Sequence, residues 1–130
     1  MAHGIISSSV FAITRWYAGL LSFVWVFLMV GVIQVRVTNN VTLGDGGIPT
    51  LATRIRGHAN FIETVPYFLI LLAVNELADE IPPYWLNIFA SCFTFGRAVH
   101  AIGFFFAEPS TPARIVGTFG ALVPISTLSL

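Results

Sequence analysis

Residues 15–36 read RWYAGLLSFVWVFLMVGVIQVR, and this stretch decides the fold class. Between its terminal arginines lie twenty residues without a formal charge. In an α-helix such a stretch extends about 30 Å, which is the thickness of the hydrocarbon core of a bilayer. Trp16 and Tyr17, at one end, are residue types typical of the interface between lipid and water. The stretch therefore predicts a transmembrane helix with an aromatic end.

Three further apolar stretches lie towards the C-terminus. Pro82 and Pro83 favour the start of a helix, and Pro66 predicts a bend because it cannot donate to the carbonyl of Ile62. We expect an all-α fold: a single integral-membrane domain spanning residues 1–130, built as a four-helix bundle with antiparallel neighbours. The expected transmembrane helices cover residues of about 10–36, 53–78, 83–106 and 111–130.

The composition favours the same class and excludes others. Hydrophobic residues make up 56% of the chain, charged residues make up 9%, and the mean hydropathy is +0.86, which is more apolar than a soluble domain. All six basic residues are arginine and the formal net charge is zero, so we expect a lipid bilayer and no nucleic acid as the partner. The single cysteine, Cys92, excludes an intrachain disulfide, and we expect it to pack in the interior.

The arginines also predict an orientation. Three of them flank the loop at residues 38–51, and Arg114 follows the turn at residues 107–110. The turn between these two has only acidic residues nearby: Glu76, Asp79 and Glu80. Because positively charged loops stay on the cytoplasmic side, we expect the first and third loops in the cytoplasm and both termini outside.

Polar side chains gather where the second and third helices approach that side. At about 100° per residue, Arg56, Asn60 and Glu63 share one stripe of the second helix. Arg97 and His100 share one face of the third helix. Since one glutamate cannot neutralise several arginines at this depth, the cluster predicts a site for an anionic ligand. The planar fork of arginine suits a carboxylate or a phosphate.

A purely structural role is the alternative for each of these residues. An arginine and a glutamate on adjacent helices also lock a bundle, and Arg36 and Arg54 also suit contact with lipid headgroups. His58 suits capping as well as ligand contact, and His100 suits a hydrogen bond to a neighbouring helix. No second histidine, cysteine or carboxylate stands at a metal-ligand spacing, so we expect no metal. No nucleophile elbow or phosphate-binding loop is present either.

Residues 56–63, RGHANFIE, followed by Pro66, resemble the Arg-x-x-x-Asn-x-x-Glu signature of the MAPEG family, the membrane-associated proteins of eicosanoid and glutathione metabolism. Further matching strings occur in the other three predicted helices: residues 34–36, 96–100 and 112–114. The resemblance covers about residues 15–125. Four matching strings in the right order make it specific.

The resemblance implies a homotrimer of four-helix subunits, with glutathione held between neighbouring subunits near the cytosolic face. Glutathione would be the co-substrate of a membrane-bound glutathione transferase or peroxidase-like protein, acting on a lipophilic small molecule that arrives from the bilayer. The compact length and short loops look more like the bacterial branch of the family, so we expect the bacterial inner membrane.

The resemblance also implies which residues hold the ligand. The glutathione-binding residues are Arg36, Arg56, Asn60, Glu63, Arg97 and His100. Arg114 matches the arginine that holds the thiolate and is the expected catalytic residue. A thiol with a pKa of about 8.5 is a poor nucleophile at neutral pH until a neighbouring cation stabilises its anion, and each unit of depression is worth about 1.4 kcal/mol.

Departures from the family pattern keep other functions open. Phe104 stands where well-studied members have a tyrosine, and Thr118 stands where some members have a second tyrosine. Ile115 stands where some prostaglandin-forming members have a polar residue, which argues against prostaglandin synthesis. One alternative is a non-catalytic MAPEG-fold protein that binds a small anionic ligand or a partner. A small multidrug transporter is a weaker alternative, because such proteins carry their acidic residue in the first helix, and residues 15–36 contain none.

Overall fold

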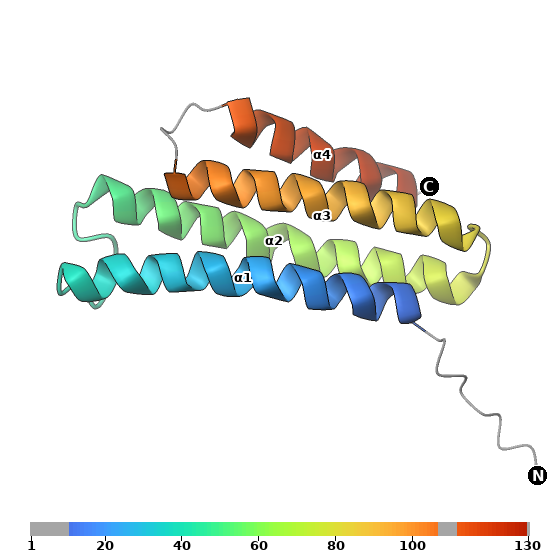
Figure 1. Ribbon diagram of the computed structural model, residues 1–130, viewed down its shortest axis with the longest axis horizontal. Coiled ribbons are helices and arrows are strands. Elements are labelled where there is room, and N and C mark those ends of the chain that lie inside the picture. The colour runs from blue at the N-terminus through green and yellow to red at the C-terminus, as the bar shows by residue number, and fades with distance from the viewer. Residues whose placement is uncertain (1–10, 107–111, 130) are drawn as a thin grey trace, which may run out of the picture.

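Four α-helices make up all the regular structure of the part of the chain that our computed structural model describes, residues 11–106 and 112–129. They are α1 (Ala12–Thr38), α2 (Pro49–Ala78), α3 (Pro83–Phe106) and α4 (Pro112–Leu128). Consecutive helices run in opposite directions and lie side by side (Figure 1). The all-α class and the four-helix bundle are confirmed.

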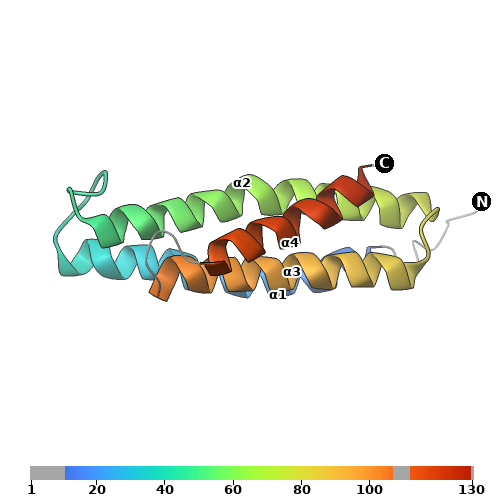
Figure 2. The same ribbon diagram turned by 90° about the horizontal axis from the view of Figure 1, so that it is seen from above.

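The bundle consists of a three-helix group with α4 packed on one side of it. α1, α2 and α3 contact one another, and α4 lies along α3. α4 then crosses towards the C-terminal end of α2 (Figure 2), where the Asn75 side-chain amide donates to the Leu128 carbonyl at 2.9 Å. Within the described residues α4 does not contact α1.

Packing inside the bundle combines large aromatic rings with glycines. The rings of Phe68 in α2 and Phe93 in α3 stack with centroids 3.7 Å apart and planes 7° apart. Between α3 and α4 the contact is so close that a Cβ on Gly117 would lie 2.6 Å from His100 Cβ and 2.8 Å from the Gly96 carbonyl oxygen. Small residues are what membrane helices use for close backbone approach, because lipid supplies no hydrophobic force between them.

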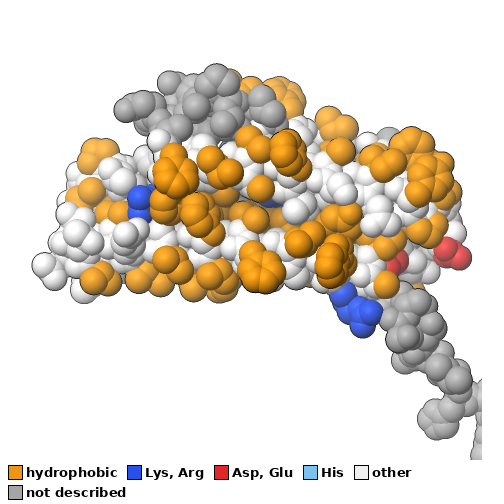
Figure 3. All heavy atoms as spheres, in the orientation of Figure 1, with side chains coloured by type: hydrophobic (Ala, Val, Ile, Leu, Met, Phe, Trp, Pro, Cys, Tyr) orange, Lys and Arg blue, Asp and Glu red, His pale blue; other side chains and the backbone are white. Residues whose placement is uncertain are grey.

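Three helices, α1, α2 and α3, are long and apolar enough to cross a membrane. α4 is also a helix, but its 17 residues extend only about 25 Å, so the expectation of four spans holds for three. The outer surface is largely apolar (Figure 3), with side chains such as Phe23 and Phe95 at least 70% exposed. An apolar outer surface on long apolar helices means that the chain is an integral membrane protein in contact with lipid.

α2 begins at Pro49, several residues before the expected start near residue 53. Proline suits the first helical position because its missing N–H needs no partner there and its φ is already helical. The helix then continues through Pro66 to Ala78 without interruption.

Two predicted side-chain positions were wrong. Tyr17 does not sit in an interfacial belt but is buried, and its hydroxyl lies 2.7 Å from Ser91 Oγ and donates to the Asn87 carbonyl at 3.1 Å. Cys92 is exposed on α3 rather than packed in the interior. In a membrane helix the outward face is also apolar, so hydrophobicity does not separate lipid-facing from interior positions.

The N-terminus of α1 is capped by a side chain from another helix. Its own N-cap residue, Phe11, provides no side-chain hydrogen bond. Instead, the Glu76 carboxylate near the end of α2 accepts from the amides of Ile13 and Thr14, both at 2.9 Å, and from the Thr14 hydroxyl at 2.7 Å. A carboxylate at this position satisfies free amides and complements the positive end of the helix dipole.

Substitution of Gly117 by alanine should destabilise the protein by about 1–3 kcal/mol, because the added methyl group overlaps a backbone oxygen of α3 that cannot move alone. Gly19 is the matched control, since a Cβ there meets nothing within 4 Å, and Gly19→Ala should leave stability unchanged or slightly raised. Thermal unfolding of the detergent-purified proteins measures both. Equal midpoints for Gly117→Ala and wild type would contradict the close α3–α4 contact.

Glu76→Ala should lower stability by roughly 1–2 kcal/mol, which is the usual effect of losing a helix cap. Glu80→Ala is the control, because Glu80 is exposed and lies beyond the C-terminal end of α2. Unfolding in a series of SDS concentrations compares the two variants. If Glu76→Ala and Glu80→Ala lost equal stability, Glu76 would contribute by its charge alone and not by capping α1.

Candidate functional site

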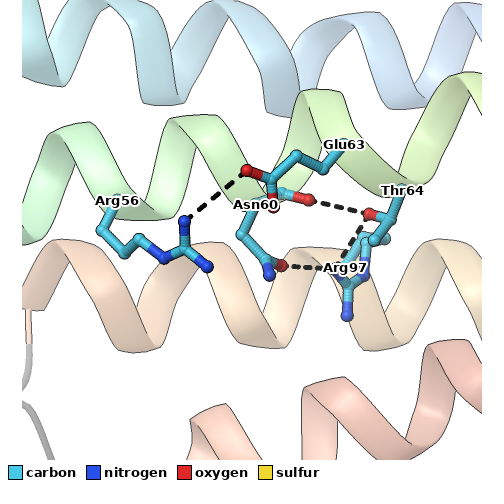
Figure 4. A network of polar contacts seen from close by, with 5 residues as sticks. All are labelled: Arg56, Asn60, Glu63, Thr64 and Arg97. Atoms are coloured by element: carbon cyan, nitrogen blue, oxygen red, sulfur yellow. Dashed lines mark hydrogen bonds and ion pairs between the residues drawn. The ribbon is translucent and has the colours of Figure 1, made fainter.

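Polar residues of α2 contact one guanidinium group of α3 (Figure 4). Arg97 of α3 donates from Nη1 to Asn60 Oδ1 at 2.9 Å and to Thr64 Oγ1 at 3.2 Å, both on α2. From Nη2 it donates to the Gly117 carbonyl of α4 at 2.8 Å. Arg97 therefore joins three helices.

Thr64 belongs to this network and was missed from the sequence. Its hydroxyl donates to the carbonyl of Asn60 at 2.9 Å while it accepts from Arg97. The signal was its i, i+4 spacing from Asn60, which places both side chains on one face of α2. The Gly117 carbonyl gave no such signal, because a backbone acceptor is independent of residue type.

The charge on Arg97 is buried and has only neutral acceptors. The residue is 2% exposed, and no carboxylate forms a salt bridge with it among the described side chains. Its Nε is also buried and has no hydrogen-bond partner there. Buried charges are usually paired, because leaving water costs each ion several kcal/mol. An unused donor on a buried cation favours an anionic ligand.

The same stripe of α2 carries an ion pair at its outer edge. Arg56 Nη1 lies 3.5 Å from Glu63 Oε1, and their side chains are 62% and 54% exposed. A pair this exposed contributes little to stability in water. Both groups are accessible to a ligand, whereas Asn60 and Arg97 are held further inside.

Beside Arg56, residues of the first loop and of α2 line an open cleft of about 480 Å³. This volume lies within the range of roughly 300–1,000 Å³ that is typical of small-molecule sites. Arg56 and Asp45 are the charged residues among those that line it: Gly44, Asp45, Ala52, Ile55, Arg56 and Ala59. The cleft and the polar network share Arg56.

Arg36 and Arg54 contact other groups than the Arg97 network within the described structure. Arg36 makes a long contact of 3.5 Å to the Val41 carbonyl in the first loop. Arg54 donates to the Gly31 carbonyl of α1 at 2.8 Å, and its guanidinium lies 4.1 Å from the ring centroid of Phe105. Arg54 thus ties α1, α2 and α3 together, and ligand contact by Arg36 stays a prediction.

The remaining predicted residues lie where α3 approaches α2 and α4. His100 is buried, with its ring 4.9 Å from the ring of Phe104 in an edge-on arrangement. Phe104 is buried too, and it packs so closely on α2 that a Cβ on Gly57 would lie 2.7 Å from it. Arg114 is part of α4, but its side chain is outside the described part of the structure.

Comparison with known proteins identifies a family for the chain. The model of the MAPEG family matches residues 14–130. The Inner membrane protein YecN of Escherichia coli strain K12 is 30% identical over 73 residues, which are 56% of this chain and 55% of that protein. The protein of the same name in strain O6:H1 matches equally well. The match thus spans about half the length of these curated relatives. No solved structure gives a significant match.

Asn60→Ala should destabilise the protein by about 1–3 kcal/mol, because it removes an acceptor from a buried charge. Asn60→Asp places a carboxylate oxygen where the amide oxygen was and should retain or raise stability, because Arg97 gains a charged partner. Thermal unfolding in detergent at neutral pH distinguishes them. If Asn60→Ala and Asn60→Asp lower the unfolding temperature equally, an oxygen acceptor at position 60 does not stabilise Arg97.

Proposed function

The chain belongs to the MAPEG family, and on that premise we propose that it is a membrane-bound glutathione transferase or peroxidase-like protein. The observation that supports this most directly is the buried Arg97 guanidinium, which has neutral acceptors and an unused donor. It donates to Asn60, which shares one stripe of α2 with the Arg56–Glu63 pair. The site has an excess of positive charge that the net negative charge of glutathione would neutralise.

The functional groups of glutathione complement the groups of the site. Its two carboxylates suit guanidinium groups, because an arginine grips two oxygens at once. Its ammonium group suits Glu63, whose carboxylate is exposed and has only a 3.5 Å contact to Arg56. Its peptide groups suit Asn60, which both donates and accepts. The cleft beside Arg56 has room for part of a tripeptide.

In this proposal Arg114 holds the thiolate. A guanidinium next to the sulfur lowers the pKa of the thiol and raises the fraction of nucleophile at neutral pH. In a conjugation, the sulfur forms a bond to an electrophilic carbon, the leaving group departs with the bonding pair, and the thiol proton goes to water. With a hydroperoxide, two glutathione molecules supply two electrons and two protons, and the products are an alcohol, water and glutathione disulfide.

We further infer a homotrimer in the inner membrane of a bacterium. The Arg56–Glu63 pair is more than half exposed on a single subunit, and charged groups on an outer helix face are unfavourable in lipid. A neighbouring subunit that covers the pair and the bound ligand would remove that cost. The YecN relatives are named as inner membrane proteins, which supports this location.

A non-catalytic member of the family is the second candidate, and one observation favours it. Three donor contacts of Arg97 already end on acceptors within the chain. In that case Arg97 holds the helices together and does not bind a ligand. A ligand would then contact only Arg56 and Glu63. Such a protein would bind a small anion without turnover.

Titration calorimetry of glutathione into the trimer-sized, detergent-purified protein should show binding, and Asn60→Asp should weaken it about tenfold or more, equivalent to about 1.4 kcal/mol, because the new carboxylate neutralises Arg97. Arg114→Ala should retain most of the binding but lose most of the turnover of chlorodinitrobenzene. Arg15→Gln is the control, because it also removes one positive charge but lies near the start of α1, away from the first loop. It should leave both binding and turnover unchanged.

The outcomes separate the two candidates. Binding with turnover that depends on Arg114 supports the transferase. Binding without turnover of either chlorodinitrobenzene or cumene hydroperoxide supports the non-catalytic protein. Absence of glutathione binding to the wild-type protein would overturn both the ligand and the reaction.

A further inference from the structure

A second concave site lies between α1 and α2, apart from the polar network. It is a groove of about 250 Å³, and its lining includes Ala18, Leu21 and Trp25 of α1 and Phe61, Val65 and Leu69 of α2. On α2 the groove is lined by positions 61–69, whereas the cleft beside Arg56 is lined by positions 52–59. The groove is therefore a different pocket from that cleft.

The lining offers few partners to a polar ligand. Ser22 is the hydroxyl residue that lines the groove, and its hydroxyl donates to the Ala18 carbonyl of its own helix at 2.8 Å. Pro66, which also lines it, has no N–H to donate, so the indole N–H of Trp25 is the side-chain donor of the lining. A groove with so few polar partners does not hold ordered water well. It suits an apolar chain.

Depth and size restrict the occupant further. The groove lies along residues 18–25 and 61–69, in the middle of two helices long enough to cross the membrane. Its side chains remain open to the surroundings, since Trp25 is 37% and Ile62 is 47% exposed. A volume of about 250 Å³ is below the roughly 300–1,000 Å³ of sites that enclose whole drug-sized ligands. It accommodates a stretch of one extended chain lying parallel to the helices.

A polar group lies beyond the end of the groove that is nearer the first loop. His58 precedes Phe61 and Ile62 by one helical turn on the same side of α2. Its ring centroid lies 6.3 Å from that of Trp25, and its Nε2 is buried without a hydrogen-bond partner in the described structure. His58 does not line the groove itself, so an ester oxygen at this end would reach the imidazole after a rotation of its side chain.

We propose that the groove between α1 and α2 binds one acyl chain of a bilayer phospholipid, with the ester oxygens at the His58 end and the chain running towards Ala18 and Leu69. Such a lipid would fill the groove between the two helices. The site goes beyond the glutathione proposal and does not depend on it, because the groove and the cleft beside Arg56 are lined by different residues.

Photo-crosslinking tests the site in phospholipid nanodiscs. One phosphatidylglycerol probe carries a diazirine near the ester, and a second carries it at the end of the chain. Peptide mass spectrometry should find the first probe near Trp25 and His58 and the second near Ala18 and Leu69. Label spread evenly over lipid-facing residues of α3, such as Phe95 and Ile102, would overturn the proposal, and so would the reverse order of the two probes.

Two adjacent positions of α1 give matched variants. Ala18 lines the groove, so Ala18→Phe should fill it and reduce labelling several-fold. Gly19 faces open space, so Gly19→Phe adds the same ring to the lipid-facing surface and should leave labelling unchanged. Thermal unfolding of both variants checks that each is folded.

Other occupants give distinct results. A diazirine fatty acid that labels the groove while the phospholipid probes do not would assign it to a free fatty acid. Crosslinks from groove residues to a second copy of the chain, without lipid label, would assign it to a subunit interface. Either result would overturn the phospholipid site, and neither would bear on glutathione binding.

Discussion

The structure depends on the need to satisfy a permanent positive charge inside an apolar bundle. Arg97 is almost fully buried, and its acceptors come from α2 and α4 rather than from its own helix. A guanidinium cannot lose its proton in a protein, so the neighbouring helices must supply oxygen atoms at fixed positions. The glycines between α3 and α4 serve that need, because they let the Gly117 carbonyl reach the guanidinium. Helix packing and the candidate site therefore share one interaction.

This arrangement also defines what the site can attract. The oxygens around Arg97 are uncharged, so they orient its donors without cancelling its field. Glu63, the carboxylate on the same stripe, is turned outwards to Arg56 instead. The inner part of the network is thus cationic, and the outer part has both signs of charge. A zwitterionic ligand with a net negative charge, as in the proposed function, would match this distribution of charge better than a simple anion.

Local periodicity explains which features were predictable from the sequence. Long apolar stretches indicated the helices, and the spacing of Arg56, Asn60 and Glu63 indicated a shared face, because both depend only on helical geometry. Which neighbour satisfies each polar group depends on tertiary contacts. Arg54, for example, donates to a carbonyl and lies over an aromatic ring, and periodicity indicated neither partner. Tyr17 is buried rather than at the interface, and Cys92 is exposed rather than in the interior. Lipid and protein interior are equally apolar, so hydrophobicity alone did not separate such positions.

The Glu76 cap has a consequence for how the polypeptide enters the membrane. The first amides of α1 find their acceptor on a residue more than sixty positions later in the chain. A nascent protein that had released only its first helix would leave those amides facing lipid or headgroups without a fixed partner. Insertion of α1 and α2 together as a hairpin avoids that intermediate. The cap of α1 therefore forms only once α2 is also in place.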